Sequence, residues 1–171
     1  MKVTISIIII TVVILGGGVW LLGSNGAKEE AKLSKPLVGD AIADQGANHV
    51  PEGTLVTYLT NPPTGGSHYA LSAKAGIYDK SVPDGNLIHS MEHGAVILWY
   101  NGLSKQDIER LKQIFNSVSI SKKIMVPHAT MDVSIALTSW GRLLKLQAID
   151  EVKIKTFMET NENRAPEKAP L

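Results

Sequence analysis

One stretch of the sequence places two histidines and a carboxylate directly before a segment that must be buried. His89, Glu92 and His93 lie within five residues, and the run Ala95 to Tyr100 that follows has a hydrophobic residue at every position. Such a run is typical of a strand that is covered on both faces. The chain must therefore place this segment inside a sheet, with the polar group at one end of that strand.

The spacing of the two histidines allows one ion to bind both. His89 and His93 are four residues apart, so their side chains share a face of a helix, and they also share a face of a strand. The sequence leaves both conformations open. On a helix Met91 points away from the pair, whereas on a strand it lies between them.

An apolar run near the N-terminus predicts a membrane span. Residues 3–22 contain no charged side chain and are long enough to cross a hydrocarbon layer of roughly 30 Å. The alternative, a cleaved signal peptide, would have a shorter apolar core of roughly 7 to 15 residues and a small-residue cleavage site, which residues 24–27 match only loosely. We therefore expect residues 1–22 to form an uncleaved transmembrane signal anchor.

The charge distribution predicts the side of the membrane and excludes one class of partner. Lys2 is the only charged residue before Leu22, which favours a single-pass protein of the cell membrane with an extracytoplasmic C-terminal domain. The rest of the chain carries equal numbers of acidic and basic residues and no basic stripe, so nucleic-acid binding is excluded. No cysteine is present, so the domain must be held together by its core. The sequence does not identify a protein partner.

Beyond the anchor we expect a linker over residues 23–48, one exported domain over residues 49–160 and a tail over residues 161–171. The predicted strands cover residues 55–60, 95–100, 123–127, 133–140 and 142–146, and the predicted helices cover 104–117 and a segment capped by Asp150. Residues 70–86 look irregular. This order predicts an α+β domain with a mainly antiparallel sheet and two amphipathic helices packed on one face.

The loop over residues 61–69 is predicted to be rigid. Its sequence, NPPTGGSHY, combines two prolines, which fix φ, with two glycines, which permit positive φ. A loop with this composition presents His68 in one direction.

Several motifs together resemble a known family. They are TNPPTGGSHY, AGIYDKSVPDGNLIHSMEHGAVILWY, the Ser-Trp-Gly step at residues 139–141 and the ending at residues 164–167. They resemble a bacterial family of exported domains known as domain of unknown function family 3105, over roughly residues 49–167. The resemblance implies a membrane-anchored or secreted domain and brings no established activity.

The resemblance also selects residues. Those that match the family's motif positions are His49, His68, His89, Glu92 and His93. The chain departs from the usual pattern at residues 65–67, and Met91 stands where the family usually has leucine. Because leucine is no metal ligand, the resemblance implies that Met91 packs in the core.

Imidazole is the commonest protein ligand for transition metals, and its affinity for Zn(II) and Cu(II) is high. We therefore predict a metal site in which His68, His89 and His93 converge, with His49 or Glu92 as a fourth ligand or as a partner that orients an imidazole. The alternative is a structural or interaction module of the cell envelope, in which the histidines bond to backbone carbonyl groups and no metal binds. His128 stands apart from these motifs and is a weaker candidate.

A third hypothesis is hydrolysis. His89 to His93 matches the H-x-x-E-H pattern, in which two histidines bind zinc and the glutamate, here Glu92, activates water. That chemistry needs a sustained helix, whereas Gly94 follows at once. It also needs a third ligand, for which Glu162 and Glu167 are the nominees. We therefore rank the metal-binding module first, the interaction module second and the zinc hydrolase third, and we do not expect an enzyme.

Overall fold

The computed structural model describes residues 30–167 and 169–171. The chain divides after Pro36 into two compact units, and the second unit, Leu37–Leu171, carries the sheet and the histidines. Of the first unit, residues 30–36 are described, and residues 30–33 are helical. Within the described residues, no helix is both long and apolar enough to cross a membrane. The anchor predicted over residues 3–22 lies outside them.

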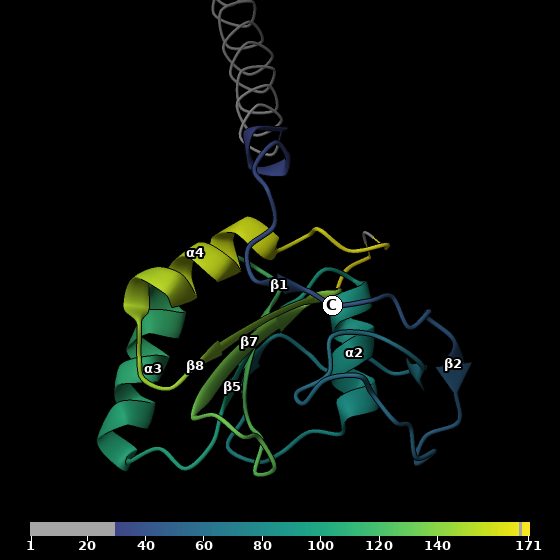
Figure 1. Ribbon diagram of the computed structural model, residues 1–171, viewed down its shortest axis with the longest axis horizontal. Coiled ribbons are helices and arrows are strands. Elements are labelled where there is room, and N and C mark those ends of the chain that lie inside the picture. Colours follow the sequence, from purple (N-terminus) through teal and green to yellow (C-terminus); the bar gives the residue numbers. More distant parts are fainter. Residues whose placement is uncertain (1–29, 168) are drawn as a thin grey trace, which may run out of the picture. The chain divides into compact units, whose positions relative to one another are not determined.

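The second unit is built on a six-stranded sheet with the strand order β1-β8-β7-β5-β6-β4 (Figure 1). The strands are β1 (Asp40–Ala41), β4 (Gly76–Ile77), β5 (Val96–Tyr100), β6 (Lys123–Pro127), β7 (Ile135–Ser139) and β8 (Arg142–Leu146). The β1–β8, β8–β7 and β7–β5 pairs are antiparallel, whereas β6 runs parallel to both β5 and β4. The α+β class and the mainly antiparallel sheet are thus confirmed.

Two helices cover one face of the sheet, as predicted. They are α3 (Lys105–Ser117) and α4 (Glu151–Asn161), seen together on one side of the sheet in Figure 1. Both begin at caps expected from the sequence, because Ser104 Oγ accepts the backbone N–H of Asp107 and the carboxylate of Asp150 accepts that of Lys153. Each cap satisfies a backbone donor that the first turn leaves free.

A third helix, α2 (Asp84–Glu92), covers the opposite face. The central strand β5 shows why both faces need cover, since its side chains alternate between two cores. Val96, Leu98 and Tyr100 face α3 and α4, whereas Ile97 and Trp99 face the core that contains Leu87, Ile88 and Met91 of α2. Met91 is fully buried there, as the resemblance implied.

Three segments differ from the expectation. Residues 55–60 form no strand, so that prediction is wrong, and Leu55 is 98% exposed. Residues 70–86 are less irregular than expected, because they contain β4 and the start of α2. Part of the range predicted as linker belongs to the sheet, since β1 pairs with residues 142 and 143 of β8.

Candidate metal centre

Helix α2 determines where three of the predicted residues lie. It ends at Glu92, and His93 forms its C-cap, with its N–H donated to the His89 carbonyl group at 3.1 Å. The following residue, Gly94, has φ +92°, a left-handed conformation that turns the chain into β5. The helical alternative for this motif is therefore the one the protein adopts, and it places His89 and His93 one turn apart on one face.

A small parallel ladder brings the other two histidines to the end of this helix. It consists of β2 (His49–Val50) and β3 (His68–Tyr69), and its register sets His49 opposite His68. The residues before His68 are held in place, because the hydroxyl of Tyr58 donates to the Ser67 carbonyl group at 3.0 Å. The rigid loop predicted from its prolines and glycines thus delivers His68 fully buried.

Three imidazole rings are oriented in the same way. The Nδ1 atom of His68 lies 2.8 Å from the Gly66 carbonyl oxygen, and that of His89 lies 2.7 Å from the Tyr69 carbonyl oxygen. The Nδ1 atom of His93 lies 3.2 Å from the carbonyl oxygen of Pro170. A carbonyl oxygen can only accept, so each Nδ1 carries a proton, and a neutral ring in this orientation has its lone pair on Nε2.

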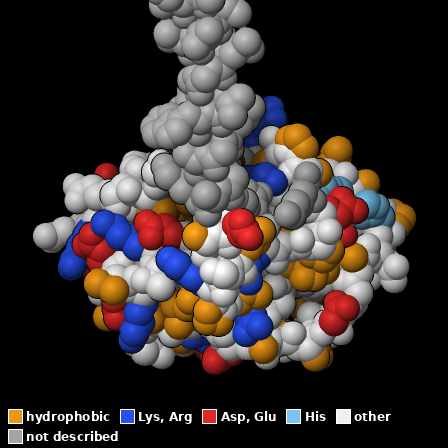
Figure 2. Space-filling model, turned by 90° about the horizontal axis from the view of Figure 1, so that it is seen from above, with side chains coloured by type: hydrophobic (Ala, Val, Ile, Leu, Met, Phe, Trp, Pro, Cys, Tyr) orange, Lys and Arg blue, Asp and Glu red, His pale blue; other side chains and the backbone are white. Residues whose placement is uncertain are grey.

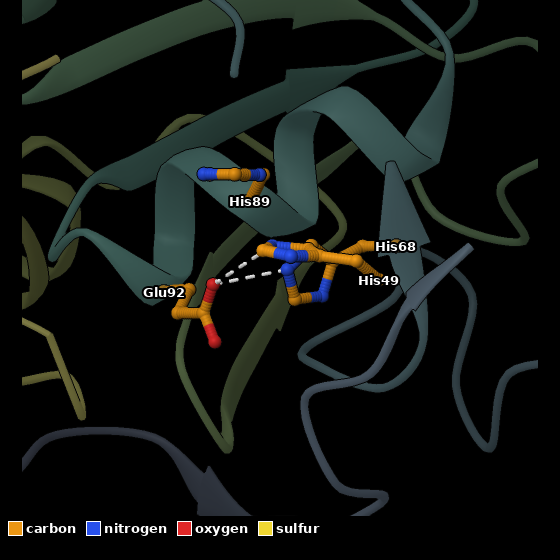
Figure 3. A group of neighbouring side chains, drawn as sticks. All are labelled: His49, His68, His89 and Glu92. Atoms are coloured by element: carbon orange, nitrogen blue, oxygen red, sulfur yellow. Dashed lines mark hydrogen bonds and ion pairs between the residues drawn. The ribbon is translucent and has the colours of Figure 1, made fainter. Parts of the chain in front are cut away.

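These Nε2 atoms face one another or a carboxylate. His68 Nε2 lies 3.0 Å from Glu92 Oε2, and His89 Nε2 lies 3.1 Å from His93 Nε2. The side chain of His49, half exposed, has its Nε2 3.8 Å from the same Glu92 oxygen. Figure 3 shows Glu92 linked to the imidazoles of His68 and His49, with His89 beside them.

The ligand atoms form two groups that share one carboxylate. In the first group, atoms of His49, His68, His89 and Glu92 all lie within 4.8 Å of one another. In the second, atoms of Glu92, His93 and Glu167 meet the same limit. Histidine side chains therefore gather at one edge of the domain beside acidic side chains, as Figure 2 shows.

The electrostatics favour a neutral ring at the centre. Burial lowers the pKa of His89, and the neighbouring imidazoles of His93, His68 and His49 lower it further, whereas the hydrogen bond to Tyr69 opposes this shift. Neutral imidazole is the form that binds a metal ion.

The segment after α4 completes the site. Glu167 Oε2 lies 3.4 Å from His93 Nε2, and the Glu167 backbone N–H donates to the Glu92 carbonyl group. The Lys122 ammonium donates to the carbonyl groups of both His93 and Ala169. Residues expected to form a tail are therefore packed against the cluster.

The outcome for each predicted residue can now be stated. His49, His68, His89 and Glu92 lie together, and His93 joins them through His89 but belongs to the second group. Of the two nominated acids, Glu167 reaches His93, whereas Glu162 accepts the backbone N–H groups of residues 121 and 122 instead. His128 pairs with Asp84 at the opposite end of α2.

Sequence reasoning missed two contributors to this site. Lys122 and the Pro170 carbonyl group act only through long-range contacts with His93, for which the local sequence carries no signal.

With the geometry established, comparison with known proteins gives the family. The family described as protein of unknown function, DUF3105, matches residues 49–170. The chain belongs to this family, so the predicted family is confirmed. No curated protein and no solved structure matches the chain.

Proposed function

We propose that this protein is a histidine-rich module that binds a transition-metal ion, zinc or copper. One observation carries the proposal: His68, His89 and His93 each have Nδ1 on a backbone carbonyl oxygen and Nε2 turned toward another ligand atom. Carbonyl groups that hold Nδ1–H are the usual partners that orient metal-binding imidazoles.

The short contacts at the centre support a bound cation. With Nδ1 protonated, the His89 and His93 rings place two lone pairs 3.1 Å apart, and the His68 ring places a lone pair 3.0 Å from a carboxylate oxygen. Electron pairs at these distances repel unless a proton or a metal ion lies beside them. A metal ion beside either pair would relieve that contact without charging the rings.

The donor set and its spacing also suit these ions. Bonds of 2.0 to 2.1 Å in a tetrahedral site separate the ligand atoms by roughly 3.3 Å, and Glu92 Oε2 lies 3.0 Å from His68 Nε2 and 3.8 Å from His49 Nε2. Imidazole nitrogen with one carboxylate oxygen suits Zn(II) and Cu(II) better than Mg(II) or Ca(II), which prefer oxygen alone.

We also propose, from the apolar sequence of residues 3–22, that the module is anchored in the cell membrane and faces the extracytoplasmic side. Metal bound there would be exchanged with the envelope or the medium.

The test is metal analysis of the purified full chain. After equilibration with zinc or copper and removal of free ions, we expect at least one equivalent per chain in the wild type and near-complete loss in His68→Ala and His89→Ala variants. His128→Ala is the matched control, because it removes an imidazole that lies outside the cluster. Wild-type protein that retains no metal would refute the proposal.

A second candidate is an interaction module whose polar cluster is purely structural. It is favoured by one observation: among the described residues, every buried side-chain nitrogen and oxygen atom has a hydrogen-bond partner. In that case the same histidine variants lose thermal stability, and no metal is found in any of them.

Hydrolysis remains the third candidate. Helix α2 ends at Glu92, so the sustained helix that the H-x-x-E-H chemistry needs is missing, and Glu92 contacts the ring of His68 as a ligand would. A Glu92→Gln variant that keeps metal and loses a measured peptidase activity would support this candidate.

A further inference from the structure

We propose that the cluster holds two metal ions, bridged by the carboxylate of Glu92. This inference rests on the proposed metal-binding function and adds a second metal position, made by residues 93 and 167 together with Glu92. It starts from the fact that the two groups of ligand atoms have Glu92 in common.

The first position is the buried one. His68 is fully buried, and His89 and Glu92 are 7% and 5% exposed, so these three ligands are fixed by the core around them. His49 supplies the fourth ligand from the surface, with a side chain that is 53% exposed. Four protein ligands fill a tetrahedral site and leave no place for a fifth.

The second position lies on the other side of Glu92. His93 Nε2 lies 3.4 Å from Glu167 Oε2, and both residues have a ligand atom within 4.8 Å of Glu92. His93 is excluded from the first group although its Nε2 lies only 3.1 Å from that of His89. Six donors around one ion exceed the four that zinc takes, whereas two ions about 3.5 to 4 Å apart account for both groups.

The contacts around Glu167 place its backbone beside the end of α2, within reach of the second position. Its backbone N–H donates to the Glu92 carbonyl group at 3.1 Å, which ties the segment to the end of α2. The Lys122 ammonium joins the carbonyl groups of His93 and Ala169 at 2.7 and 2.6 Å. The segment around Glu167 is thus attached through two main-chain groups, the N–H of Glu167 and the carbonyl group of Ala169, although the Glu167 side chain is 57% exposed.

The two positions differ in chemistry. The first has three imidazoles and one carboxylate, whereas the second has one imidazole and two carboxylates and therefore suits harder ions as well. Only three protein ligands serve the second ion, which leaves an open position for water or a small anion. The second ion is therefore the exchangeable one.

The experiment counts the ions and measures the distance between them. The wild-type full chain is titrated with zinc, and zinc content is determined by elemental analysis after dialysis. X-ray absorption spectroscopy then looks for metal–metal scattering at about 3.5 to 4 Å. Glu167→Gln and Glu167→Ala remove the exposed ligand of the second position, and Glu159→Gln on the exposed face of α4 is the matched control.

We expect two equivalents and metal–metal scattering in the wild type and in Glu159→Gln, and one equivalent without that scattering in both Glu167 variants. A wild type that holds one equivalent overturns the second position and leaves the proposed function intact. Two equivalents that survive in both Glu167 variants also overturn it. A wild type that holds no zinc or copper refutes the proposed function itself. Because Glu167 is exposed, circular dichroism should show that its variants fold.

Discussion

A methyl group added at Gly94 should destabilise the domain more than the same change at a glycine with a similar backbone. Gly94 has φ +92° and Gly53 has φ +84°, so alanine at either position costs about 1–2 kcal/mol for its left-handed conformation. The two sites differ in their surroundings. A Cβ atom at Gly94 would lie 2.8 Å from the Cα atom of Asn163, whereas one at Gly53 meets nothing within 4 Å.

The clash at Gly94 involves backbone, which cannot rotate away. The Asn163 N–H also donates to the Gly94 carbonyl group at 2.9 Å, so moving the two chains apart weakens that bond. Overpacking of this kind costs about 1–3 kcal/mol. Gly94→Ala is therefore expected to lose about 2–5 kcal/mol and Gly53→Ala about 1–2 kcal/mol.

The assay is equilibrium unfolding of the full chain in urea, followed by tryptophan fluorescence, with the slope m compared between variants. A lower midpoint for Gly94→Ala at equal m would support the close approach of residues 94 and 163. Equal free energies of unfolding for the two variants would refute it.

Three further results are expected. Because Met91 is fully buried, Met91→Ala should lower the free energy of unfolding in urea by about 2–5 kcal/mol. Met91→Leu should lower it by less than about 1.5 kcal/mol and leave the metal content unchanged. Loss of metal in Met91→Leu would contradict the packing role of Met91. Thr138→Val should cost about 1–3 kcal/mol, because the buried Trp99 Nε1–H then loses the hydroxyl that it contacts at 2.8 Å, and Thr138→Ser should restore most of that loss. Removing the metal with a chelator should lower the free energy of unfolding by about 2.7 kcal/mol relative to protein in which the free metal concentration is 100 times its dissociation constant. An unchanged melting temperature would count against metal binding in the folded state.

The elements predicted well from the sequence are those whose signal is local. The run that became β5 is apolar throughout because both of its faces are covered, and the predicted bounds of β6 agree with the structure. Helices α3 and α4 were found because Ser104 and Asp150 are capping residues followed by apolar side chains at helical spacing.

The misses have physical causes. Residues 55–60 have the composition of a strand, but Leu55 is exposed, and within the part of the chain that the structure describes no strand pairs with them. Helix α2 begins without a side-chain cap at Pro83, and Gly85 in its first turn lowers the helical signal.

The candidate site was predicted in part. The shared face of His89 and His93 was predicted from their spacing of four residues, and the shaped loop before His68 was predicted from its prolines and glycines. The pairing of β2 with β3, which brings His49 to the cluster, joins segments nearly twenty residues apart. No local pattern shows such a pairing, and the same holds for the contact of Glu167 with His93.

Helix α2 carries the proposed ligand residues on one side and core residues on the other, so the two sets cannot move independently. A change in the angle between His89 and Glu92 would have to shift Leu87, Ile88 and Met91 against the sheet, where packing is dense. An ion held there must accept the coordination geometry that the fold imposes. Discrimination between ions of equal charge would then come from the stereochemistry that each ion prefers.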